Sequence, residues 1–155
     1  MQNIENQNII KLGALSYQIL AINVKINDYA MIKGFPCRVT SVRTSLPGKH
    51  VIKTYIEGIN IFTGKKYEDI TKPQLNIEIP YVQQTEYQLI DISDDNYLTV
   101  LLENGQIRED LKLPDGQPQL VQNLKADLKK QKDIIVTILS SMGQEQLISY
   151  KEISN

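Results

Sequence analysis

One segment of this sequence, Gln117–Lys130, has the periodicity of a helix, and short strand-like runs make up most of the remainder. Leucines recur at four-residue spacing at Leu120, Leu124 and Leu128, and Pro118 suits the first helical position. Elsewhere, runs rich in Ile, Val and Tyr are separated by Gly, Pro, Asn and Asp, a pattern typical of strands and turns. The sequence therefore predicts a mainly β protein with one helix.

The composition changes within "TKPQLNIEIPYVQQTEY", where two prolines lie among several Gln and Asn residues. We therefore expect a domain boundary at about 80–84, which gives a first domain over 14–81 and a second over 82–155. Residues 1–13 are rich in Asn and Gln and lack periodicity, so a mobile tail is expected there.

Charge divides along the same boundary. Up to Tyr81 the chain has 10 Lys and Arg against 6 Asp and Glu, and beyond it 7 against 12. Such an asymmetry favours a polyanionic partner for the first domain. Random variation between two solvated surfaces explains the counts equally well.

The second domain has a recognisable strand order. "EYQLIDI" and "YLTVLLENGQIRED" predict three strands with turns at Asp94–Asn96 and at Asn104-Gly105, a strong hairpin signal. After the helix, "DIIVTILSSM" and "QLISYKEI" predict two more strands. Three strands, a helix and two strands fit a five-stranded Greek-key barrel of the OB type.

The first domain begins with the strand-like run "SYQILAINVKI", followed by "YAMIKG". A turn is expected at Gly34-Phe35-Pro36, with a strand starting at Cys37 because proline is tolerated at a strand start. A hairpin should follow, with strands over about 38–44 and 51–57. Its tip, Leu46–Lys49, has Pro and Gly where a type II turn requires them. Gly58 shifts the apolar alternation, which suggests a bulge or a bend.

Catalytic and metal-binding constellations are not evident in this sequence. Cys37 and His50 are the single cysteine and the single histidine, so neither a disulfide nor a multi-cysteine zinc site can form within the chain. A buried, inert Cys37 is the simpler interpretation. The acidic "REDLKLPDG" is best explained as a solvated loop. We expect no enzyme activity, no metal, no cofactor and no small-molecule substrate.

The chain also lacks an apolar run of membrane-spanning length and the charged and apolar regions of a secretory signal. A soluble cytoplasmic protein without a membrane partner is therefore expected.

Lys49 permits two interpretations from the residues alone. It is either a solvated lysine on a turn, or a cation presented at a hairpin tip to a polyanionic site, a use that suits its long stem and compact charge. The same alternatives apply to Lys65, Lys66, Arg38 and Arg43.

Four ordered segments, "TSLPGKH", "GINIFTGKKYEDI", "YQLIDI" and "GQIREDLKLPDG", resemble the eukaryotic translation factor five-A family, the hypusine-containing factor related to bacterial elongation factor P. The resemblance extends over about 23–139. It implies an SH3-like (KOW-type) β-barrel followed by an OB fold, with a hinge between them.

The resemblance also implies a function. Members of the family bind the ribosome beside the peptidyl-tRNA and promote peptide-bond formation at stalling sequences such as proline runs, and they aid termination. Lys49 matches the lysine that deoxyhypusine synthase and deoxyhypusine hydroxylase convert to hypusine with an aminobutyl group from spermidine. The implied partners are peptidyl-tRNA, rRNA and ribosomal proteins. The residues expected to contact RNA or the ribosome are Ser45, Gly48, Lys49, His50, Arg38, Arg43, Lys53, Lys65 and Lys66.

The chain departs from the family at the tip. The family pattern is Lys-Thr-Gly-Lys-His-Gly-His-Ala-Lys, whereas Leu46 and Pro47 stand at its first two positions here and the second glycine and second histidine are missing. Two hypotheses therefore stay open: a hypusinated elongation factor, and a divergent paralogue that binds RNA or ribosomes through an unmodified lysine.

Overall fold

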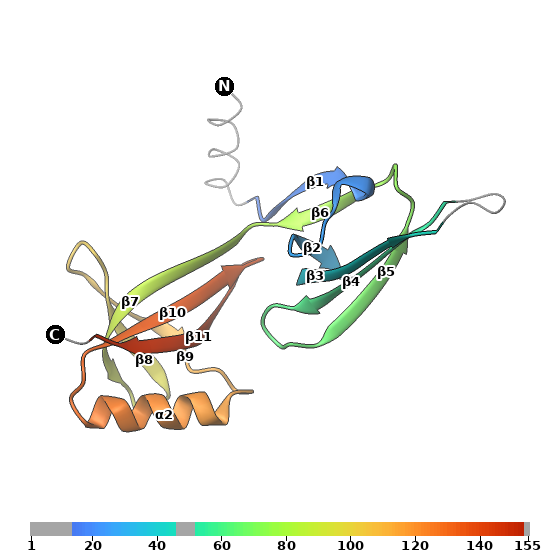
Figure 1. The fold of residues 1–155 in the computed structure, drawn as a ribbon. Coiled ribbons are helices and arrows are strands. Elements are labelled where there is room, and N and C mark those ends of the chain that lie inside the picture. Colours follow the sequence, from blue (N-terminus) through green and yellow to red (C-terminus); the bar gives the residue numbers. More distant parts are fainter. Residues whose placement is uncertain (1–13, 46–51, 154–155) are drawn as a thin grey trace. The chain divides into compact units, whose positions relative to one another are not determined.

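The computed structural model describes residues 14–45 and 52–153, and its chain divides into two compact units (Figure 1). Unit 1 comprises the described residues up to Val82 together with the turn Ser141–Gly143, and unit 2 comprises 83–140 and the described residues from Gln144 onward. Both are built from antiparallel strands, so the prediction of a mainly β protein is confirmed. None of the helices in the described part of the chain is long and apolar enough to cross a membrane.

Unit 1 consists of a four-stranded sheet and a two-stranded sheet. The larger sheet has the order β2-β3-β4-β5, the smaller one pairs β1 with β6, and β2 also lies against β6. The result is a small barrel of the SH3-like type. Its elements are β1 (Ser16–Leu20), the 3-10 turn η1 (Ala21–Asn23), β2 (Tyr29–Ile32), β3 (Phe35–Thr44), β4 (Thr54–Asn60), β5 (Lys66–Thr71) and β6 (Asn76–Pro80).

Strict alternation along β4 sets the two faces of the larger sheet. Thr54, Ile56, Gly58 and Asn60 are buried, and the three residues between them are partly exposed. Among them, Ile56 belongs to a core that consists of Val24, Ala30, Ile32, Cys37, Val39, Ile56 and Ile79. The other face of β4, which we call the outer face, therefore points away from this core.

Gly58 lies where the structure leaves no space for a side chain. A Cβ at this position would lie 2.8 Å from Ile32 Cδ1 and 2.9 Å from the Arg38 carbonyl oxygen. The expected bulge at Gly58 is wrong in its location, because the β4–β5 register is regular and the irregularity lies in β3, between Val39 and Ser41, opposite Gly58.

Two expected boundaries in unit 1 are also wrong. The turn before β3 is Lys33-Gly34, where both residues have positive φ (53° and 83°), so Phe35 pairs with Ile32 and β3 starts two residues before Cys37. Two consecutive residues with φ > 0 match the twist of a tight hairpin. The first strand ends at Leu20, because Ala21 N–H donates to the Leu75 carbonyl (2.8 Å) and the chain turns away.

Unit 2 has the strand order β11-β10-β7-β8-β9, and β9 also contacts β11. This closed, five-stranded arrangement is an OB fold, as the strand order predicted. The elements are β7 (Val82–Ile92), β8 (Tyr97–Leu101), β9 (Ile107–Lys112), α2 (Pro118–Lys129), β10 (Ile134–Ser141) and β11 (Gln144–Glu152).

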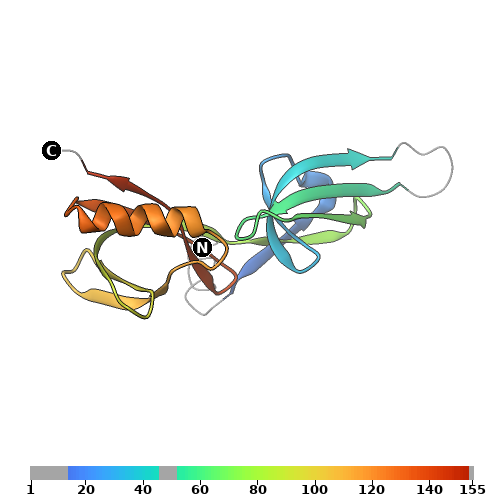
Figure 2. The same ribbon diagram turned by 90° about the horizontal axis from the view of Figure 1, so that it is seen from below.

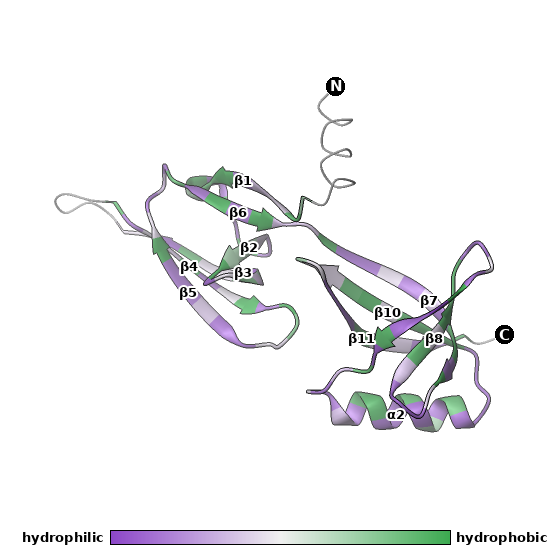
Figure 3. Cartoon of the chain, turned by 180° about the vertical axis from the view of Figure 1, so that it is seen from behind, coloured by the Kyte–Doolittle hydropathy of each residue, from purple (hydrophilic) through white to green (hydrophobic). Residues whose placement is uncertain are grey.

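Helix α2 starts at Pro118 and lies along one side of the unit 2 sheet (Figures 1 and 2). Hydrophobic and hydrophilic residues alternate along it in Figure 3, and Leu124 is fully buried while Leu120 and Leu128 pack at its sides. The core it covers contains Leu89, Leu98, Val100, Leu111, Leu113, Leu124, Ile134, Val136, Ile138 and Leu147.

Ion pairs join the two edge strands of the unit 2 sheet, β9 and β11. Arg108 on β9 donates to both oxygens of Glu145 on β11 and also to Asp110. These hydrogen bonds, first those to Glu145, raise the pKa of Arg108 further above its usual range, and Arg108 lowers that of Asp110. The cluster therefore fixes β9 against β11 where their side chains meet.

A second polar cluster joins α2 to β11. The Tyr150 hydroxyl donates to Asp127 Oδ2 (2.8 Å), while Lys132 lies 3.7 Å from Asp127 and 3.2 Å from Glu152. The Tyr150 hydrogen bond, and after it the positive charge of Lys132, lower the pKa of Asp127. Asp127 is thus held as a carboxylate at the C-terminal turn of the helix.

Candidate functional site

The predicted site is the segment between β3 and β4, and both of its anchors are described. Ser45 N–H donates to the Lys53 carbonyl (2.8 Å), and Lys53 N–H donates to Ser45 Oγ (3.0 Å). Thr44 pairs with Thr54 directly behind this clamp. Gly48, Lys49 and His50 lie outside the described residues, so their roles stay predictions, as does the type II turn at Leu46–Lys49. The sequence boundary for the second strand was too early, because β4 begins at Thr54.

The end of the sheet that carries the clamp, which we call the loop end, also carries Arg43. Its guanidinium carbon lies over the ring of Tyr55, 4.7 Å from the ring centroid, and the two residues are register partners on β3 and β4. Lys53 is exposed beside them. Three predicted contact residues, Arg43, Ser45 and Lys53, are therefore brought together here.

Arg38 occupies the outer face further along β3, as the partner of Ile59. Its Nη1 donates to Asn27 Oδ1 at 3.1 Å, so part of its donor capacity is used within unit 1. Five residues separate Arg38 from Arg43, which is about 16 Å at the usual rise of a strand.

Lys65 and Lys66 are at the opposite end from the clamp, in and after the turn between β4 and β5. Lys66 Nζ is 3.5 Å from Glu57 Oε2, and the Lys65 carbonyl accepts from Asn60 N–H. The length of β4 separates them from the loop end by about 20 Å. The structure therefore divides the predicted contact residues into two groups and does not support a single cationic patch.

Tyr55 was not among the predicted contact residues. The signal for it is cross-strand register: counting outward from the Ser45–Lys53 clamp pairs Thr44 with Thr54 and then Arg43 with Tyr55. The sequence alone did not show which residues of β3 and β4 pair across the loop between them, so the Arg43–Tyr55 pairing could not be predicted from it.

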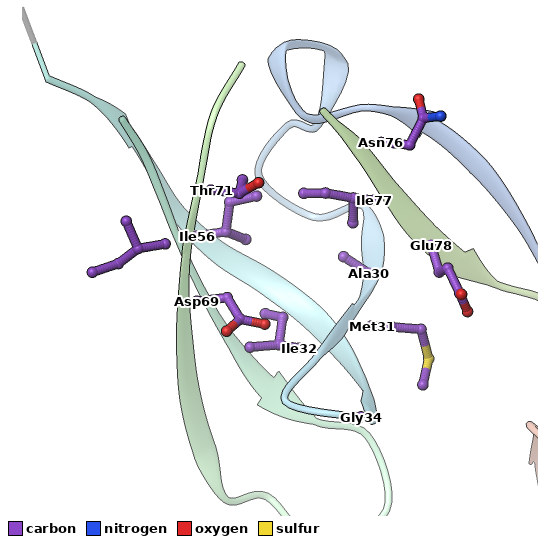
Figure 4. Close-up of a pocket in the computed structure, with 11 residues that line it drawn as sticks. Ala30, Met31, Ile32, Gly34, Ile56, Asp69, Thr71, Asn76, Ile77 and Glu78 are labelled. Carbon is purple, nitrogen blue, oxygen red and sulfur yellow. The ribbon is translucent and has the colours of Figure 1, made fainter. Parts of the chain in front are cut away.

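A cavity of about 440 Å³ opens in unit 1 between β2, β5 and β6 (Figure 4). Ala30, Ile32, Ile56 and Ile77 supply apolar walls. Both carboxylates in its lining have partners: Asp69 lies 3.0 Å from Lys33 Nζ and accepts from Lys33 N–H (3.0 Å), and Glu78 accepts from Ser16 Oγ (3.1 Å). The cavity therefore has the character of an opening in the barrel rather than of a catalytic centre.

The remaining candidates for chemistry are not assembled into a site. Cys37 is fully buried, and this burial raises the pKa of its thiol, which favours the unreactive protonated form. His50 lies outside the described residues. Within residues 14–45 and 52–153, no group of three His, Cys, Asp or Glu side chains is placed to hold a metal ion.

Comparisons with known proteins cover both units. Residues 16–74 match the family model described as translation initiation factor 5A-like, N-terminal, and residues 81–151 match the one described as eukaryotic elongation factor 5A hypusine, DNA-binding OB fold. The chain is 46% identical over 126 residues to eukaryotic translation initiation factor 5A of Spodoptera exigua, covering 81% of this chain and 78% of the relative. It is 42% identical over 139 residues to eukaryotic translation initiation factor 5A-1 of Arabidopsis thaliana, covering 89% and 87%.

Solved structures agree. A translation initiation factor eif-5a family protein from Naegleria fowleri superposes with a TM-score of 0.85 at 41% identity, covering 89% of this chain and 99% of that one. Eukaryotic translation initiation factor 5A from Methanococcus jannaschii gives a TM-score of 0.65 at 24% identity, covering 89% and 96%, and supports the fold alone. The chain therefore belongs to the eukaryotic translation initiation factor 5A family, and it is a translation factor of that family.

Proposed function

We propose that this chain is an elongation factor that binds the ribosome beside the peptidyl-tRNA and promotes peptide-bond formation at stalling sequences such as proline runs, with a further role in termination. The observation that carries the proposal is family membership over both units. The proposed partners are peptidyl-tRNA, rRNA and ribosomal proteins, and the proposed location is the cytoplasm.

Lys49 is the proposed acting residue. Hypusine would lengthen its side chain and add a second cationic nitrogen, which suits contact with tRNA backbone phosphates at a distance from the barrel. In this proposal the ribosome supplies the chemistry, and the factor contributes positioning of the acceptor end. No cofactor is required, and the modifying partners are deoxyhypusine synthase and deoxyhypusine hydroxylase.

The clamp at the loop end supports this role. Ser45 and Lys53 fix both ends of the segment that contains Lys49 through two hydrogen bonds. A fixed base reduces the conformational freedom that must be lost when a tip residue reaches a target. Arg43 and Lys53 add positive charge next to that base.

A second candidate function is an RNA- or ribosome-binding module that keeps an unmodified lysine. The specific observation in its favour is the tip sequence, where Leu46 and Pro47 replace the family residues and Val51 follows His50 directly. This module would associate with ribosomes without accelerating peptide transfer.

The test is synthesis of a polyproline reporter in a translation extract depleted of its own factor and supplemented with this protein. We expect Lys49→Arg and Lys49→Ala to reduce reporter synthesis by about tenfold or more, because both misplace or remove the positioning group. Lys25→Ala, which removes the same charge at an exposed residue of unit 1 outside the predicted contact residues, is the matched control. Full activity of both Lys49 variants would exclude the elongation role.

Intact mass and peptide mapping of the protein from its own cells separate the two candidates. A mass increase at Lys49 that matches hypusine supports the elongation factor. An unmodified Lys49, combined with ribosome association that survives Lys49→Ala, supports the binding module.

A further inference from the structure

Three residues on neighbouring strands form a row across the outer face at the loop end. Arg43 on β3 pairs with Tyr55 on β4, and Tyr55 pairs with Ile70 on β5. The strands lie side by side in Figure 1. Ile70 is 57% exposed, Arg43 is exposed, and its guanidinium lies over the Tyr55 ring. We call Arg43, Tyr55 and Ile70 the outer row.

Arg43 differs from the other arginine on this face in what it contacts. Arg38 donates to Asn27, whereas the contact of Arg43 is with an aromatic ring. Among the described residues, Arg43 forms no ion pair. A guanidinium supported by an aromatic ring keeps its donors free at its edges and presents a flat cation to solvent.

The next row along the sheet carries the opposite charge. Glu57 and Glu68 are register partners, two residues along from Tyr55 and Ile70 on the same face. Lys66 pairs with Glu57, and Glu68 is exposed. Because carboxylates repel phosphates, the exposed Glu68 disfavours a phosphate on this row. A phosphate beside the outer row is therefore favoured on the side of the loop end, where Lys53 is exposed.

The chemistry of the row fits one ligand class. Unpaired nucleobases stack on aromatic side chains and on arginine guanidinium planes, and each stacked base adds affinity with little dependence on sequence. The guanidinium edges can also donate to the adjoining phosphate. The excess of 10 Lys and Arg over 6 Asp and Glu up to Tyr81 is consistent with an RNA partner.

We propose that the outer row binds one unpaired nucleobase of RNA, with the Arg43 guanidinium sandwiched between the base and the Tyr55 ring. This deepens the proposed function and rests on it, because ribosomal RNA and tRNA are then the ligands. Ile70 provides an apolar edge for the base or its ribose, and the exposed carboxylate of Glu68 disfavours a phosphate on the neighbouring row.

The experiment uses the full chain and a short single-stranded oligouridine that contains one 2-aminopurine, whose fluorescence is quenched when it stacks. We expect quenching by the unaltered protein, and binding weakened about fivefold or more by Arg43→Ala. Arg43→Lys keeps the charge but lacks the planar guanidinium, so it should retain salt-dependent binding and lose the quenching. Tyr55→Phe should retain both.

Lys25→Ala is the control, because it removes an exposed positive charge from unit 1 at a residue outside both the outer row and the predicted RNA contacts. Its effect should stay within about twofold, as is usual for an exposed charge away from the ligand. Glu68→Gln should strengthen binding by removing a repulsive carboxylate. Thermal unfolding of each variant checks that the barrel is intact.

Three results would overturn the proposal: no quenching by the unaltered protein, equal losses for Lys25→Ala and Arg43→Ala, or quenching preserved in Arg43→Lys. Its failure is distinguishable from that of the elongation role. A protein that quenches the probe but does not respond to Lys49 substitution in the polyproline reporter keeps the outer row and loses the elongation role, and the converse result does the reverse.

Discussion

The two units differ in how many large hydrophobic side chains they expose to solvent. In unit 2, α2 covers the core and Arg108 joins β9 to β11, and the large exposed hydrophobic residues in its described part are Ile90, Tyr97, Ile107 and Ile153. Unit 1 exposes more of them: Leu15, Tyr17, Leu20, Ile22, Ile26, Phe35, Ile52, Ile70 and Leu75. Unit 1 therefore leaves more large hydrophobic side chains open to solvent than unit 2 does.

The largest effect that tests this comparison should come from Leu124→Ala. Leu124 is fully buried between α2 and the unit 2 sheet, so its truncation should cost about 2–5 kcal/mol of unfolding free energy through lost burial and a cavity. Leu120→Ala, at the half-buried side of the same helix, should cost less. Urea unfolding combined with amide hydrogen exchange measures where the loss occurs.

If Leu124→Ala reduces the protection of amide hydrogens from exchange in unit 1 as much as in unit 2, the two units do not unfold separately. Loss of this protection only in 83–140 and 144–153 would show that unit 2 unfolds on its own.

A smaller effect is expected from Gly58→Ala in unit 1. The added Cβ would meet Ile32 Cδ1 and the Arg38 carbonyl, and such overpacking typically costs about 1–3 kcal/mol. Gly116→Ala is the control, since nothing lies within 4 Å of a Cβ there. Its effect should stay within about 0.5 kcal/mol. The measurement is the denaturant midpoint of unfolding for each variant. Equal midpoints for Gly58→Ala and Gly116→Ala would show that β3 moves away from the added Cβ at no cost.

The smallest expected effect is on how the stability of unit 2 depends on pH. The pKa of Asp127 is lowered in the folded protein, first by the Tyr150 hydrogen bond and then by Lys132. A carboxyl with a lowered folded pKa stabilises the protein above its unfolded pKa of about 3.9, and this contribution is lost as the pH falls through the folded value. Stability of unit 2 should therefore decline on acidification below about pH 5.

Asp127→Asn should reduce that dependence, and Tyr150→Phe should reduce it partly, because it removes the hydrogen bond but leaves Lys132. Thermal midpoints across this pH range provide the measurement. An unchanged slope in Asp127→Asn would mean that the cluster between α2 and β11 does not contribute to acid stability.

The sequence predicted those features that depend on local signals. The spacing of Leu120, Leu124 and Leu128 located the helix, Pro118 located its first residue, and Asn104-Gly105 marked the turn between β8 and β9. Each of these rests on residues close together in the chain, where periodicity and turn chemistry act directly.

Some features that depend on long-range pairing were not predicted correctly. The register irregularity lies in β3, opposite Gly58, and β1 ends at Leu20, where the Ala21 N–H donates to the Leu75 carbonyl. The same limit applies to the site: the alignment of Arg43 with Tyr55 follows from the register of β3 and β4, which no local pattern encodes.

The Ser45–Lys53 clamp has a consequence for protein engineering. The two hydrogen bonds and the Thr44–Thr54 pair join residues that flank the segment 46–51 on either side. That segment is therefore an exchangeable cassette: loops of other family members can be grafted between the same two anchors while the barrel stays constant. Differences in activity among such chimaeras would then belong to the loop.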